Sequence, residues 1–213
     1  MKYYFFDLDG TLTDPGLGIT NSVQKALLAY GIREENREKL YPFIGPPLAD
    51  SFIRYYGFTR EKALEAINHF RAYFRDKGIF ENEVYPGIPQ LLSELKKQGK
   101  KVILATSKPE EFAIRILKHF DLYGYFDLVC GATMDETGRC EKIDVLRYAL
   151  LESGADPKES YMIGDRKYDI EAGKILGLST VGVLYGYGDE EEMKKAGADI
   201  VCQRVSDLAK NLL

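Results

Sequence analysis

Residues 4–14 read YFFDLDGTLTD, an apolar run that stops abruptly at two carboxylates one residue apart. The aromatic run has no polar alternation, which is typical of a strand buried on both faces of a parallel sheet. Asp7 and Asp9 follow that strand, and Gly10 and Thr11 come next. A buried carboxylate is costly unless something pairs with it. The stretch therefore predicts a site at the strand end, the alternative being the acids of an ordinary turn.

The chain after residue 83 alternates strand-like and helix-like segments. The predicted strands are 101–105, 125–131, 159–165 and 179–186, and the main predicted helices after them are 109–119, 142–153, 167–177 and 206–213. Alternation of this kind is typical of an α/β fold whose parallel sheet is covered by helices. We therefore expect a doubly wound, Rossmann-like parallel sheet.

Residues 15–82 interrupt this alternation with a mainly helical stretch. Ala63, Ile67 and Phe70 recur at helical spacing, and Thr59 precedes them as a candidate N-cap. Because the stretch follows directly on the first strand, it is predicted to be an inserted helical domain. The expected core domain then comprises residues 1–14 and 83–213.

The composition is that of an ordinary globular protein, with 45% hydrophobic and 29% charged residues. A net charge of −4 and a pI near 5.4 give no basic face for nucleic acid. The three cysteines are widely spaced and form no CxxC pair, which favours reduced thiols in a cytoplasmic protein. Neither a secretory signal nor an apolar run of membrane-spanning length is present, so no membrane association is expected.

Polar residues gather at the carboxyl ends of several predicted strands. They are Asp7 and Asp9 after the first, Thr106, Ser107 and Lys108 after the second, and Asp165 and Asp169 after the fourth, with Lys142 at the start of the helix before the fourth. Parallel strands share one carboxyl edge, so these groups can converge. The acids suit Mg²⁺, and the hydroxyl, ammonium and backbone amides suit phosphate oxygens. A carboxylate beside such a phosphate can attack it, and a second can transfer the proton.

Local explanations compete with this reading at each position. Asp165 and Asp169 could simply cap the helix that follows them. Thr106 and Ser107 could cap the helix after Pro109, and Lys142 could be an ordinary solvated lysine.

The motifs at these strand ends resemble those of the haloacid dehalogenase superfamily of phosphotransferases. DLDGTLTD (7–14) resembles the first motif, VILATSK (102–108) the second and MIGDRKYD (162–169) the fourth, while Lys142 stands at the place of the third-motif lysine. The resemblance covers the whole chain, and the insertion at 15–82 lies where members with a small helical cap carry theirs. Within the superfamily the chain looks most like phosphoglycolate phosphatases and bacterial 5′-nucleotidases, through FIGPPLADSF (43–52) and GVLYGYGDEEEM (182–193).

The resemblance implies a role for each matched residue. Asp7 is the nucleophile that becomes aspartyl-phosphate, and Asp9 is the general acid and base. The implied Mg²⁺ ligands are Asp7, Asp9 through its backbone carbonyl, and Asp165, with Asp169 in support. Thr106 and Lys142 hold the transferring phosphoryl group, and Gly10, Thr11, Ser107 and Lys108 are implied to bind substrate.

One departure from the family pattern leaves the phosphate-binding lysine open. Many relatives have Lys-Pro at the third motif, whereas this chain reads CEKIDVL (140–146). Lys142 is the first candidate, Lys108 the second, and Arg139 a third.

These roles predict an enzyme, a Mg²⁺-dependent phosphatase that acts on a small phosphorylated metabolite. Phosphoglycolate and nucleoside 5′-monophosphates are the first expected substrates. A sugar phosphomutase would use the same core residues, and a non-catalytic phospho-accepting module is the alternative from another class. The sequence indicates neither the cap residues that set specificity nor the oligomeric state.

Overall fold

The computed structural model describes residues 1–134 and 138–213. The chain divides into two compact units, one formed by Met1–Thr13 with Val84–Leu213 and the other by Asp14–Glu83. The second unit is thus inserted into the first, directly after the segment that carries Asp7 and Asp9.

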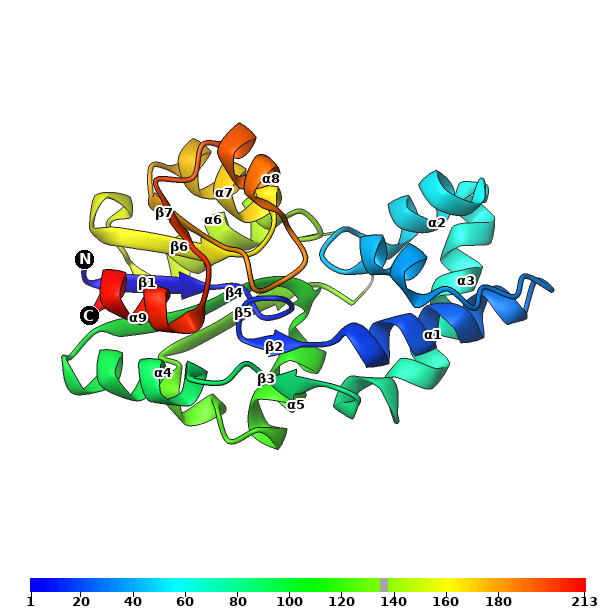
Figure 1. Cartoon of the computed structure of the whole chain (residues 1–213), viewed down its shortest axis with the longest axis horizontal. Helices are drawn as coiled ribbons and strands as arrows, with labels where there is room; N and C mark the ends of the chain where they lie inside the picture. The colour runs from blue at the N-terminus through cyan, green and yellow to red at the C-terminus, as the bar shows by residue number, and fades with distance from the viewer. Residues whose placement is uncertain (135–137) are drawn as a thin grey trace. The chain divides into compact units, whose positions relative to one another are not determined.

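The first unit contains a six-stranded parallel sheet with the strand order β5-β4-β1-β6-β7-β8 (Figure 1). Its strands are β1 (Tyr3–Phe6), β4 (Lys101–Pro109), β5 (Leu128–Ala132), β6 (Ser160–Gly164), β7 (Ser179–Val183) and β8 (Ile200–Cys202). The parallel α/β fold expected from the sequence is confirmed. β1 lies at the point where the strand order reverses, which is where ligand sites form in such sheets.

Helices cover both faces of this sheet (Figure 1). They are α4 (Ile88–Lys97), α5 (Glu110–His119), α6 (Lys142–Ser153), α7 (Lys167–Leu176), α8 (Glu190–Ala196) and α9 (Val205–Leu212), with short 3-10 turns η3 (Tyr123–Tyr125) and η4 (Pro157–Glu159). Phe5 of β1 pairs in register with Ile103 and Met162, and all three are buried with Leu146 of α6 and Ala172 of α7. This packing fixes the central strand and the start of the segment that follows it.

The second unit is helical. It contains α1 (Gly16–Leu28), η1 (Arg37–Phe43), α2 (Leu48–Tyr56), α3 (Arg60–Phe74) and η2 (Gly78–Phe80). Thr59 caps α3 as expected, since its side chain accepts a hydrogen bond from the Lys62 amide. The rings of Phe43 and Phe58 pack against Phe52 in its core. No helix among the described residues has the length and apolar character that crossing a membrane requires.

Two features of the connections differ from the sequence prediction. A short two-stranded ladder pairs β2 (Thr13–Asp14) with β3 (Glu83–Val84). These two strands are the places where the chain passes from one unit to the other. β4 runs on to Pro109, and its register against β5 shifts between Thr106 and Pro109. The shift marks an irregularity at the end of β4, where the polar residues begin.

Candidate active site

β1 delivers Asp7 to the carboxyl edge of the sheet. The Asp7 amide continues the ladder by donating to the Ile163 carbonyl at 2.9 Å, and the residue is 5% exposed. Its Oδ1 accepts a hydrogen bond from the Leu8 amide at 2.8 Å. Among the described residues, hydrogen bonds and ion pairs reach only Oδ1 of this carboxylate. Oδ2 is therefore the oxygen of Asp7 that remains available to contact a ligand.

The chain turns sharply after Asp9, and Gly10 makes the turn possible. Gly10 has a φ of +80°, and the amides of Leu12 and Thr13 both donate to the Leu8 carbonyl. A Cβ at position 10 would lie 2.1 Å from Oδ2 of Asp165. Only glycine combines this backbone conformation with such a close approach. The turn thus brings the first motif against the fourth, and the Thr11 hydroxyl donates to Oδ1 of Asp165 at 3.3 Å.

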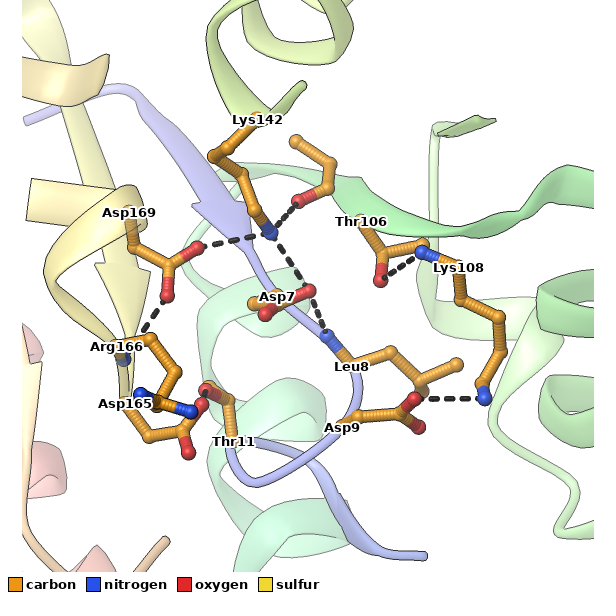
Figure 2. A network of polar contacts seen from close by, with 11 residues as sticks. Asp7, Leu8, Asp9, Thr11, Thr106, Lys108, Lys142, Asp165, Arg166 and Asp169 are labelled. Carbon is orange, nitrogen blue, oxygen red and sulfur yellow. Dashed lines mark hydrogen bonds and ion pairs between the residues drawn. The ribbon is translucent and has the colours of Figure 1, made fainter. Parts of the chain in front are cut away.

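Lys142 joins the first and fourth motifs through its ammonium group (Figure 2). The Nζ atom lies 2.8 Å from Oδ1 of Asp7, 2.8 Å from Oδ1 of Asp169 and 3.0 Å from the Ala105 carbonyl. The ammonium thus forms ion pairs with two carboxylates and a hydrogen bond with one carbonyl oxygen. Burial acts to lower the pKa of Lys142, but the charges of Asp169 and Asp7 raise it above its ordinary value. Lys142 is therefore a buried permanent cation and not a solvated surface lysine.

Asp165 and Asp169 stand at the carboxyl end of β6 and in the first turn of α7. Both are fully buried. Oδ2 of Asp165 accepts from the Tyr187 amide at 2.8 Å, and Oδ2 of Asp169 accepts from the Arg166 amide at 3.1 Å. The helix-capping alternative is thus realised for Asp169, in addition to its ion pair with Lys142. The carboxylate of Asp165 faces the turn at Gly10 instead.

The three acids Asp7, Asp165 and Asp169 form a group that could hold a metal ion. Each offers a carboxylate oxygen within 4.8 Å of the others. Burial, together with the charges of Asp169 and Asp7, raises the pKa of Asp165 well above its ordinary value. Burial also raises the pKa of Asp169 to about 6, against the opposing charge of Lys142. Three buried carboxylates face one ammonium, so in their ionised forms they would carry more negative charge than Lys142 balances, and a divalent cation would compensate it.

Asp9 lies outside this group and belongs to a second pair (Figure 2). Its Oδ2 lies 2.6 Å from Nζ of Lys108, and both side chains are largely buried. Burial raises the pKa of Asp9, although the charge and hydrogen bond of Lys108 oppose the shift. The two lysines that the sequence offered as candidates for phosphate binding therefore contact different acids. Lys142 contacts Asp7, and Lys108 contacts Asp9.

The remaining predicted residues line the end of β4 or lie apart from it. The Thr106 hydroxyl is buried and accepts from the Lys108 amide at 3.3 Å, and the N-cap residue of α5, Pro109, makes no side-chain capping hydrogen bond. Ser107 is partly exposed, and among the described residues its side chain makes no hydrogen bond. Arg139 pairs with Glu110 at 3.3 Å and lies over the Tyr148 ring at 3.8 Å. The Arg139 guanidinium is thus engaged by Glu110 and Tyr148, whereas Lys142 is the residue that contacts Asp7.

The segment after β7 completes the site, although the sequence indicated no role for its residues there. The Tyr185 hydroxyl donates to the Thr11 carbonyl at 2.9 Å, and the Tyr187 amide binds Asp165. A Cβ at Gly186 would lie 2.2 Å from the Gly10 carbonyl oxygen, and one at Gly188 would lie 2.0 Å from the Asp165 carbonyl oxygen. The alternating glycines of GYG (186–188) were the available signal, since they mark close backbone approach.

Comparison with known proteins places these features in one family. Residues 4–183 match the family described as haloacid dehalogenase-like hydrolase. A 5′-nucleotidase of Pseudomonas aeruginosa is 44% identical over 89% of this chain and 85% of that protein. The tyrosine-protein kinase PtkA of Mycobacterium tuberculosis is 37% identical over 92% of this chain and 66% of its own length. The crystal structure of a predicted phosphatase from Clostridium acetobutylicum is 45% identical, with a TM-score of 0.96 over 99% of this chain and 97% of that one.

Proposed function

The chain belongs to the haloacid dehalogenase-like hydrolase family, and we propose that this phosphatase hydrolyses small phosphomonoesters with Mg²⁺ through an aspartyl-phosphate on Asp7. The observation that carries the proposal is the state of the Asp7 carboxylate. Its Oδ1 is held by the Leu8 amide and the Lys142 ammonium, which leaves Oδ2 oriented for attack. Holding a nucleophile in one geometry removes much of the entropic cost of reaction.

In the proposed reaction, Oδ2 of Asp7 attacks the phosphorus atom and the bond to the ester oxygen breaks. Asp9 donates a proton to the leaving oxygen, for which its raised pKa is suited. Asp9 then takes a proton from water, and the water oxygen attacks the phosphorus and releases inorganic phosphate from Asp7. Lys142, which donates to the Ala105 carbonyl, and Thr106 are proposed to receive phosphate oxygens at the end of β4.

Mg²⁺ is the proposed cofactor, with Asp7, Asp165 and Asp169 and the backbone carbonyl of Asp9 as its proposed protein contacts. The grouping of three buried carboxylates, whose oxygens lie within 4.8 Å of one another, supports this choice. When bound, the ion would offset the charge repulsion between the substrate phosphate and these carboxylates. The helical unit 14–83 is proposed to act as a cap that sets specificity and excludes water.

Nucleoside 5′-monophosphates are the first substrates to test, because the 44% identical relative is named a 5′-nucleotidase. Phosphoglycolate is the second. We place the protein in the cytoplasm, acting without a nucleic-acid or membrane partner.

The decisive experiment measures phosphate release from p-nitrophenyl phosphate and from a panel of phosphomonoesters. Asp7→Asn should fold and show no measurable turnover, whereas Asp14→Asn, in the same stretch but exposed, should retain activity. Excess EDTA should abolish wild-type activity. Full turnover by Asp7→Asn or in EDTA would exclude the mechanism.

The products separate the two alternatives. A sugar phosphomutase would give an isomer without free phosphate. A phospho-accepting module would be labelled once and would not turn over.

A further inference from the structure

Glu192 of α8 contacts the segment that carries Asp165 and Asp169. Its Oε1 accepts a hydrogen bond from the Lys167 amide at 2.7 Å and lies 3.0 Å from Nε of Arg166. Its Oε2 lies 3.4 Å from Nη2 of Arg166. The Glu192 and Arg166 side chains are only 20% and 15% exposed, so this fork is largely withdrawn from solvent.

The contacts of Glu192 lead directly to the acids of the site. Arg166 follows Asp165 in the chain, and its amide donates to Oδ2 of Asp169. Lys167 is the first residue of α7, and Arg166 supplies no side-chain acceptor at the helix start. Glu192 supplies one from another helix, where a negative charge also suits the positive end of the helix dipole.

Residues 187 and 188, which precede α8 in the chain, also contact the segment that begins at Asp165. The Tyr187 amide binds Asp165, and Gly188 allows the chain to pass against the Asp165 carbonyl. Residues 165–167 are thus held from the Gly188 side and from the Glu192 side, by one stretch of the chain. The motif GVLYGYGDEEEM (182–193) acquires a role in this way, which its sequence alone did not reveal.

We propose that Glu192 is a positioning residue for the cation site: by holding Arg166 and the first amide of α7, it fixes the carboxylates of Asp165 and Asp169 for a divalent ion. This inference rests on the proposed Mg²⁺-dependent function. Among the described residues, the Glu192 side chain contacts Arg166 and Lys167 and none of the three acids, so any effect on the acids passes through these two residues. Groups that orient metal ligands typically contribute about tenfold to a hundredfold in metal affinity.

The test is a Mg²⁺ titration of the purified full chain by calorimetry, with no substrate present. Glu192→Gln should raise the dissociation constant for Mg²⁺ by about tenfold. Glu191→Gln is the matched control, because Glu191 is the adjacent acid of α8 and pairs with Lys195 in solvent. The control should bind Mg²⁺ like the wild type.

Kinetics provide a second readout that a purely structural salt bridge would not give. In Glu192→Gln, the Mg²⁺ concentration for half-maximal activity should rise by a similar factor. The KM for substrate at saturating Mg²⁺ should stay near the wild-type value. Arg166→Gln keeps the backbone amide that binds Asp169 but breaks the same fork, so it tests the proposal should Glu192→Gln fail to fold.

The outcomes separate this inference from the proposed function. Wild-type binding of Mg²⁺ with an unchanged affinity in Glu192→Gln and Arg166→Gln would overturn the role of Glu192 and leave the phosphatase mechanism intact. Absence of Mg²⁺ binding by the wild type would overturn both proposals. Weakened binding in both variants, with normal binding in Glu191→Gln, would support the inference.

Discussion

At the scale of single residues, the site is organised around the balance between three buried acids and Lys142. One ammonium forms ion pairs with Asp7 and Asp169 and donates to the Ala105 carbonyl, so it links the end of β1 to β4 and α7. A buried charge is tolerated only with partners of this kind. Lys142 therefore contributes to stability as well as to the geometry of Asp7.

Replacing Lys142 by methionine should destabilise the protein strongly when no divalent cation is present. Lys142→Met leaves the acids without a cation, and removing one partner of a buried ion pair costs about 3–5 kcal/mol. Urea denaturation in EDTA measures the loss. Lys97→Met, which removes an exposed lysine paired with Glu94, should unfold like the wild type. Equal stability of Lys142→Met and the wild type would contradict this account of the charge balance.

Gly10 offers a test of how closely the first and fourth motifs must approach. Gly10→Ala places a Cβ 2.1 Å from Oδ2 of Asp165 in addition to straining a φ of +80°. Displacing a site residue by about 1 Å can cost about a hundredfold in rate, so we expect a loss of that order in phosphate release. Gly99→Ala has a similar φ of +71° and no atom within 4 Å of the new Cβ. It should lose only about 1 kcal/mol of stability and keep full activity.

The convergence of the acids and Lys142 could be predicted from the sequence, whereas their hydrogen-bond partners could not, for a physical reason. Asp7, Asp165 and Lys142 stand at strand and helix ends, and a parallel sheet brings such ends to one edge. The pairing of Asp9 with Lys108 depends on side-chain conformations at the irregular end of β4, which periodicity does not encode. The hydrogen bond from the Tyr187 amide to Asp165 uses a backbone N–H group, which every residue except proline carries. The residue type at position 187 therefore does not predict this contact.

At the scale of elements, the strands and main helices of the first unit follow from hydrophobic pattern, and their ends follow from local contacts. α6 spans 142–153 as predicted, because an amphipathic stripe ends at a left-handed Gly154. η1 and the β2–β3 ladder were not predicted, because a 3-10 turn containing Pro42 and two-residue strands are too short to show a period.

Asp127, which immediately precedes β5, links β4 and α4 through contacts that should depend on pH. Its carboxylate accepts from the Val102 amide at 2.9 Å and pairs with Lys96 and Lys101. Burial acts to raise the pKa of Asp127, but the hydrogen bonds from Lys96, Val102 and Lys101 together lower it. A lowered pKa in the folded state means that the carboxylate stabilises the fold above its unfolded pKa, near 4.

Asp127→Asn should therefore reduce the free energy of unfolding by about 1 kcal/mol at pH 7. The difference from the wild type should shrink as the pH falls through the unfolded and then the folded pKa of Asp127, because the wild-type carboxyl then becomes neutral too. Urea denaturation between pH 7 and pH 3 measures it. Asp144→Asn, at an exposed pair with Arg147, should differ little from the wild type throughout. A difference that is constant with pH would show that the charge of Asp127 is not responsible.

At the scale of the whole molecule, the acidic site is assembled from distant parts of one unit. Asp7, Lys142, Asp165 and the Tyr187 amide all belong to the unit of residues 1–13 and 84–213. None of the contacts described for the acid group comes from residues 14–83. Binding of a cation should therefore be a property of the first unit alone, whereas substrate specificity is proposed to involve the second.

Hydrogen exchange with and without Mg²⁺ tests this division directly. A ligand that binds only the folded site suppresses local opening there, by an amount that grows with the ligand concentration above its dissociation constant. In the absence of substrate, Mg²⁺ should slow amide exchange in residues 7–13, 163–169 and 185–188, and leave residues 14–83 unchanged. NaCl at equal ionic strength is the control for general screening, and Asp165→Asn should abolish the effect. Protection by Mg²⁺ confined to residues 14–83, or protection that persists in Asp165→Asn, would place the cation elsewhere. Protection of the three predicted segments together would show that they respond to one bound ion, because residues 7–13 and 163–169 carry the three carboxylates and residues 185–188 contact both segments.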